Sequence, residues 1–135
     1  MRDIRSYIVA AAALVTLASH LVHAQSPIDP STTLVGRWEG QIEYRGTGRG
    51  RGGVTLVIDS VQASQAEGRY GEQGSVQSVN IIIEQTDAQI VLKFSTAPGR
   101  EANLTLQGGK RLVGQYRSSG LAGGGEVPMW FEKVR

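Results

Sequence analysis

The fold is decided by a stretch of regular alternation, Leu34-Val35-Gly36-Arg37-Trp38-Glu39-Gly40-Gln41-Ile42-Glu43-Tyr44-Arg45. Its even-numbered residues are apolar, aromatic or glycine, whereas the odd-numbered residues from Arg37 onward are charged or polar. Side chains of a β-strand point alternately to opposite faces of the sheet. The pattern therefore predicts a strand with one face on a core and the other face in water.

The same period of two returns along the rest of the chain. It is found at residues 54–58, 67–71, 81–83, 90–94, 104–106, 112–116 and 129–131, and turn signals separate these segments. No segment has a helical period over the length that a crossover between parallel strands needs, so we expect antiparallel pairing. We predict an all-β fold, a single antiparallel eight-stranded up-and-down barrel over residues 34–135. A two-sheet sandwich is the alternative, and glycines within the strands favour the barrel, whose strands must bend.

Residues 1–24 have the three-part design of a secretory signal. Arg2 and Arg5 precede the uncharged run Tyr7–Ala18, and small residues at Val22 and Ala24 favour cleavage after Ala24. The uncharged run reaches about 18 Å, which is less than the roughly 30 Å of a bilayer's hydrocarbon core. We therefore expect a cleaved bacterial Sec-type signal, a periplasmic or secreted protein, and no membrane span in the mature chain. Residues 25–33, which contain two prolines, are expected to be a flexible lead-in.

The expected mature chain contains neither His nor Cys, because His20 and His23 fall within the signal. This excludes a Cys or His nucleophile, a Ser-His-Asp triad, disulfides, and zinc sites built from thiolates or imidazoles. We predict a protein that is not an enzyme and holds no metal and no cofactor. The whole chain has 14 Lys and Arg against 12 Asp and Glu, and this near balance argues against nucleic-acid binding.

The opening Gly36-Arg37-Trp38-Glu39-Gly40 resembles the G-x-W start of calycin barrels, which include lipocalins, fatty-acid-binding proteins and avidins. The resemblance implies that Trp38 closes one end of the barrel and that Lys133 or Arg135, from the last strand, lies over its ring. The layout of residues 34–135 is also similar to small, lipocalin-like exported bacterial barrels that are mostly uncharacterised. The short length and the lack of a disulfide and of a C-terminal helix distinguish the chain from true lipocalins.

The predicted inner positions hold the candidate ligand-binding residues. An eight-stranded barrel is just wide enough to be filled by side chains or to hold one small ligand. We predict a monomer that binds a small apolar or amphipathic ligand at the barrel mouth, and a filled core is the alternative. The predicted ligand-binding residues are Trp38, Tyr44, Tyr70, Phe94, Tyr116, Met129 and Phe131.

A loop rich in glycine and arginine, residues 46–53, follows the first predicted strand. Arg45, Arg49 and Arg51 place three positive charges there, with no acidic residue before Val54. The pattern indicates either a loop that binds an anion or a partner, or a mobile hairpin kept soluble by arginines. The alternative function is therefore a protein-interaction or inhibitor-type module of the bacterial envelope, which contacts its protein partner through this loop and an outward-facing Trp130.

Overall fold

The computed structural model describes residues 28–43, 51–72, 74–119 and 125–135, with the backbone alone at Arg51. These residues form one short helix and eight strands. In chain order they are α1 (Pro30–Leu34), β1 (Gly36–Glu43), β2 (Arg51–Gln62), β3 (Gln65–Glu72), β4 (Ser75–Gln85), β5 (Ile90–Ala97), β6 (Arg100–Gln107), β7 (Arg111–Ser118) and β8 (Gly125–Lys133).

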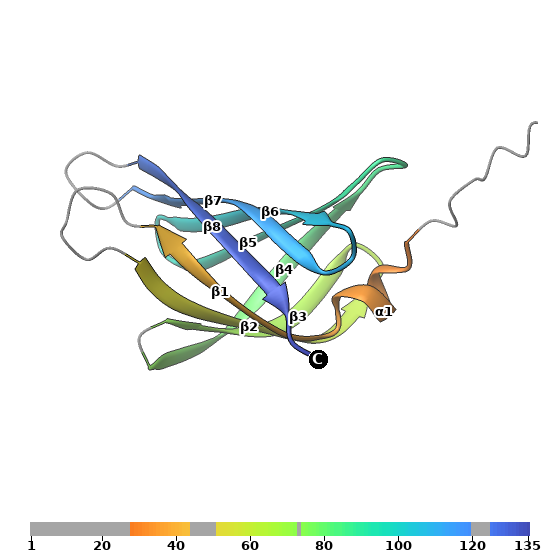
Figure 1. Cartoon of the computed structure of the whole chain (residues 1–135), viewed down its shortest axis with the longest axis horizontal. Coiled ribbons are helices and arrows are strands. Elements are labelled where there is room, and N and C mark those ends of the chain that lie inside the picture. Colours follow the sequence, from red (N-terminus) through yellow and green to blue (C-terminus); the bar gives the residue numbers. More distant parts are fainter. Residues whose placement is uncertain (1–27, 44–50, 73, 120–124) are drawn as a thin grey trace, which may run out of the picture.

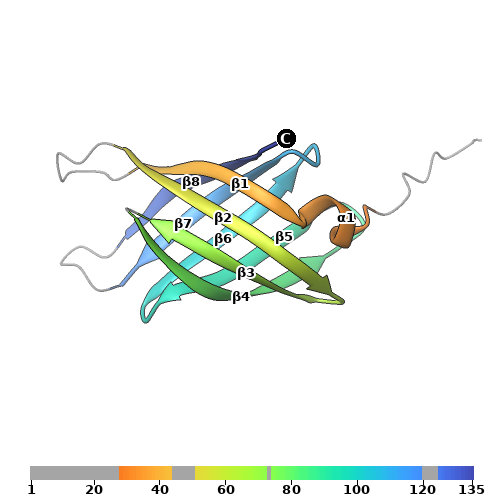
Figure 2. The same ribbon diagram turned by 90° about the horizontal axis from the view of Figure 1, so that it is seen from below.

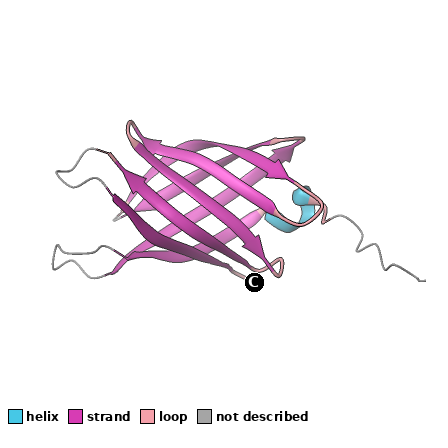
Figure 3. Cartoon of the chain, turned by 90° about the horizontal axis from the view of Figure 1, so that it is seen from above, coloured by secondary structure: helices cyan, strands magenta, loops and turns pink. Residues whose placement is uncertain are grey.

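The eight strands close into one antiparallel barrel (Figure 1). Each strand pairs with its neighbour in sequence, and β8 returns to β1, where Trp38 lies opposite Lys133 and Ile42 lies opposite Met129. Figure 3 shows the strands winding around a common axis, with α1 at one end. The prediction of an eight-stranded up-and-down barrel is confirmed, and the sandwich is wrong.

The inward-facing side chains form one hydrophobic core. In β1, Trp38 and Ile42 are buried while Arg37 and Glu39 are exposed, as the alternation predicts. The core side chains of all eight strands are at most 8% exposed. A hollow interior would leave its lining accessible to water, so this degree of burial means that the core is packed by its own side chains.

Two glycines allow neighbouring strands to approach closely. A Cβ atom at Gly40 would lie 1.7 Å from the carbonyl oxygen of Trp130, and one at Gly114 would lie 1.8 Å from that of Asn103. The space beside each glycine is therefore filled by the backbone of the adjacent strand. In-strand glycines are typical of positions where another backbone approaches this closely.

The predicted flexible lead-in and the predicted start of the first strand need correction. Residues Pro30–Leu34 form α1 rather than loop and strand, and β1 begins at Gly36. The helix forms because Asp29 caps it, its Oδ1 accepting a hydrogen bond from the backbone N–H of Ser31 at 3.0 Å, and because Pro30 suits the first helical turn. Leu34 remains fully buried, but as part of the helix that covers one barrel end (Figure 2).

Trp38 joins this helix to the barrel. Its Nε1 donates a hydrogen bond to the carbonyl oxygen of Leu34 at 2.9 Å. The Nζ of Lys133 lies 5.6 Å from the centre of the Trp38 ring and donates to the carbonyl oxygen of Thr33 at 2.6 Å. Of the two basic residues that the resemblance implied, Lys133 therefore lies over the tryptophan.

Candidate functional site

A layer of polar side chains crosses the interior near the end of the barrel opposite α1, which we call the mouth. The Tyr70 hydroxyl donates to Glu72 Oε2 at 3.2 Å on β3. The hydroxyls of Thr96 and Tyr116 lie 2.9 Å apart, and Gln77 Nε2 donates to the carbonyl oxygen of Thr96. The register explains this grouping, because Tyr70 lies opposite Gln77 and the β5–β6 pairing shifts around Thr96.

Most of this layer is shielded from solvent. Tyr70, Thr96 and Tyr116 are 2%, 5% and 3% exposed, and the Tyr70 ring packs against Phe94 with their centres 5.8 Å apart. The tyrosine hydroxyls bond to protein groups, as buried hydroxyls generally must. Any ligand in the mouth would have to replace these internal bonds.

The predicted ligand-binding residues divide between the two ends of the barrel and its centre. Tyr70, Phe94 and Tyr116 come together at the mouth, whereas Trp38 lies at the α1 end. Met129 and Phe131 point inward and are fully buried in the core. Tyr44 lies outside the described residues.

Sequence reasoning missed three members of the mouth layer, Glu72, Gln77 and Thr96. Their place in the alternation could have revealed them, because each is a polar residue at an inward-facing position of its strand. Tyr70 and Glu72 share one face of β3, and Phe94 and Thr96 share one face of β5.

The hydrogen bond between Thr96 and Tyr116 can be tested by a double-mutant cycle. We expect Thr96→Val or Tyr116→Phe to lower the free energy of unfolding by about 1–3 kcal/mol, because each leaves a buried hydroxyl without its partner. The double variant should lose less than the sum of the two changes. Urea unfolding measures all four proteins, with Thr55→Val on the outer face of β2 as the control; strictly additive losses would show that the bond contributes nothing.

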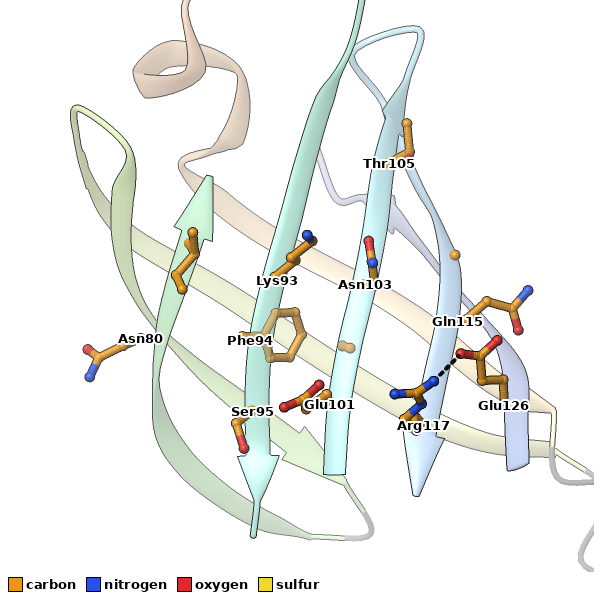
Figure 4. Close-up of a pocket in the computed structure, with 13 residues that line it drawn as sticks. Asn80, Lys93, Phe94, Ser95, Glu101, Asn103, Thr105, Gln115, Arg117 and Glu126 are labelled. Atoms are coloured by element: carbon orange, nitrogen blue, oxygen red, sulfur yellow. Dashed lines mark ion pairs between the residues drawn. The ribbon is translucent and has the colours of Figure 1, made fainter. Parts of the chain in front are cut away.

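A groove of about 770 Å³ lies on the outer face of the wall across β4 to β8 (Figure 4). Its floor is built from cross-strand rows of outward side chains. Lys93, Asn103 and Gln115 are successive partners in one row. In the next row Glu101 faces Arg117, which faces Glu126. The sequence did not reveal this groove, since its residues have the ordinary pattern of a solvated strand face.

The charges of the groove are balanced. Arg117 contacts Glu126 at 3.3 Å, and Lys93 contacts Glu84 at 3.0 Å. The remaining lining includes the side-chain amides of Asn103 and Gln115, which both donate and accept hydrogen bonds. Such a surface suits an uncharged ligand with amide or hydroxyl groups better than it suits a phosphate.

The two carboxylates of the groove stand on either side of a cation. Glu101 and Glu126 stand two strands apart, which is about 10 Å between backbones, and Arg117 lies between them in the row. Among the described residues, no group of three or more His, Cys, Asp and Glu side chains is placed to hold a metal ion.

The alternative interaction surface is described in part. Trp130 points outward from β8 and is half-buried, with the guanidinium of Arg111 5.5 Å from the centre of its ring. Arg45 and Arg49 lie outside the described residues, as does the side chain of Arg51, so the structure does not bear on the predicted arginine loop.

Comparison with family models, curated proteins and solved structures finds no match for this chain. The class of protein is therefore defined by the fold alone, a closed eight-stranded antiparallel barrel with a helix over one end. In the part of the chain that the structure describes, no helix is long and apolar enough to cross a membrane.

Proposed function

We propose that this chain is an exported, non-enzymatic binding module that recognises a protein partner with the outer wall of its barrel. The observation that supports this best is the contrast between the two faces of the wall. The core side chains are buried, whereas the outer face over β4 to β8 is hollowed into a groove that most of its lining residues make with polar side chains. A partner in this groove gains contact area without unpacking the core.

Photo-crosslinking tests this proposal. A photoreactive amino acid replaces Asn103 in the groove or, as the matched control, Glu67, an exposed residue on the outer face of β3. Each variant is irradiated in an extract of exported proteins, and crosslinked products are compared. We expect one defined partner band from position 103 and none from position 67. Equal products from both positions, or none from position 103, would count against the groove.

A small amphipathic ligand at the mouth is the second candidate function. It is favoured by the polar layer of Glu72, Gln77, Thr96 and the two tyrosines, which contrasts with the apolar core below it. A ligand at a hundred times its Kd stabilises a protein by about 2.7 kcal/mol, or roughly 11–22 °C in melting temperature for a domain of this size. A melting temperature that no fatty acid, lysolipid or envelope metabolite raises would argue against it.

A further inference from the structure

One carboxylate of the outer groove has no charged partner. Lys93 pairs with Glu84, which lies outside the groove lining, and Arg117 pairs with Glu126 inside it. Glu101 also lines the groove, and it forms no ion pair with any residue that the structure describes. These five side chains are three carboxylates and two cations, so the groove and its edge carry a net charge of −1.

The side chains on either side of Glu101 direct their donors elsewhere (Figure 4). Ser95 on β5 and Arg117 on β7 are its cross-strand partners. The Ser95 hydroxyl donates to two backbone carbonyl oxygens at 2.9 and 3.1 Å, and the Arg117 guanidinium contacts Glu126. Within the described part of the chain, the Glu101 carboxylate accepts no hydrogen bond. Its oxygens are therefore open to a donor from another molecule.

Its place in the groove distinguishes Glu101 from other exposed carboxylates. Glu67 on β3 is also exposed and also has no ion pair with a described residue, but it does not line the groove. Water solvates such a carboxylate on an open surface. A partner that covers the groove removes this water, and a covered carboxylate then costs free energy unless a cation faces it. We therefore expect the partner to bring a positive charge to Glu101.

A neighbouring amide favours arginine as the source of this charge. Asn103 lies on the same face of β6 as Glu101, two residues or about 7 Å further along the strand. Its amide oxygen is an acceptor beside the carboxylate. A guanidinium carries five N–H donors in a planar fork, so it can bond both oxygens of a carboxylate and still donate to an amide. The ammonium group of lysine has three donors and lacks this fork.

We propose that Glu101 binds an arginine side chain of the partner protein, with the guanidinium against its carboxylate and the amide oxygen of Asn103. This inference rests on the proposed function and names the side chain that the groove selects. A second positive charge beside the first would meet Lys93 or Arg117, which line the same groove and repel it. The recognised feature is therefore a single arginine in a surface that is otherwise uncharged and polar.

Crosslinking of charge variants tests the proposal. The photoreactive amino acid replaces Gln115, which lines the groove and leaves Glu101 and Asn103 intact. The concentration of exported-protein extract that gives half of the maximal crosslink is compared among the otherwise unchanged chain, Glu101→Gln and the matched control Glu67→Gln. Both glutamates are exposed, so both variants should keep the parent melting temperature. We expect Glu101→Gln to raise this concentration about tenfold and to weaken its dependence on NaCl, and Glu67→Gln to change neither.

Charge reversal supplies the signature of a direct pair. Mass spectrometry of the crosslinked band identifies the partner and the segment that carries the arginine. Changing that arginine to glutamate should weaken binding of the purified partner about tenfold or more, and Glu101→Arg should restore it. A crosslinked segment without arginine, equal effects of Glu101→Gln and Glu67→Gln, or no rescue by charge reversal overturns the inference. If the crosslink from position 103 persists in such a case, the groove function stands and the arginine inference alone falls; if neither groove position gives a band, both fall.

Discussion

Gly114→Ala should destabilise the barrel severely, lowering the free energy of unfolding by about 3 kcal/mol or more. The added Cβ would lie 1.8 Å from the carbonyl oxygen of Asn103, 2.8 Å from its carbonyl carbon and 3.0 Å from the Cα of Leu104. All three atoms belong to the backbone of β6, so no side-chain rotation relieves the overlap. The β6–β7 ladder itself must move, and it carries part of the groove.

Gly53→Ala is the matched control for this substitution. Gly53 lies in β2, and a Cβ there would have nothing within 4 Å. The same chemical change should therefore alter the stability by less than about 0.5 kcal/mol. Urea unfolding followed by tryptophan fluorescence measures both variants. Equal transition midpoints would mean that the close approach of β6 to β7 does not constrain the fold.

The barrel was predictable because a strand with one buried face has apolar and polar residues in alternation along its sequence. Even-numbered residues of β1 from Trp38 to Ile42 read as inward from the alternation alone, and the structure agrees. The start of β1 was wrong for a related reason. Leu34 is a buried apolar residue, which fits the start of a strand as well as the end of a helix. The alternation was therefore extended to Leu34, although Asp29 and Pro30 are typical of the start of a helix.

The candidate site was predictable only where it follows local periodicity. The inward phase of Tyr70 and Tyr116 followed from alternation, but the Thr96–Tyr116 bond depends on which strands become neighbours, and no local pattern records that. For β4, alternation was recognised at residues 81–83, the part that pairs with β5. Residues 75–80, of which only Val79 is buried, have no such period to detect.

Trp38→Ala should lower the free energy of unfolding by about 3–5 kcal/mol, the range for removing a large buried aromatic side chain. Trp38 is fully buried at the α1 end of the barrel. The substitution leaves a cavity in the core and removes the donor to the carbonyl oxygen of Leu34. It also removes the ring over which Lys133 lies, while Lys133 itself donates to the carbonyl oxygen of Thr33 in α1.

Trp130→Ala makes the same chemical change on the outer face. Comparing the two variants shows how much of the destabilisation comes from the burial of Trp38 and how much from the loss of any tryptophan side chain. Trp130 is half-buried and stacks with Arg111 across the β7–β8 pair, so its loss should cost about 1–2 kcal/mol. Far-UV circular dichroism during urea unfolding compares the two variants without relying on either tryptophan as the probe. Faster amide hydrogen exchange in residues 31–34 should appear in Trp38→Ala and be absent from Trp130→Ala. If the two substitutions cost the same, Trp38 does not hold the helix-covered end together, and the packed core would have to be stabilised mainly elsewhere in the barrel.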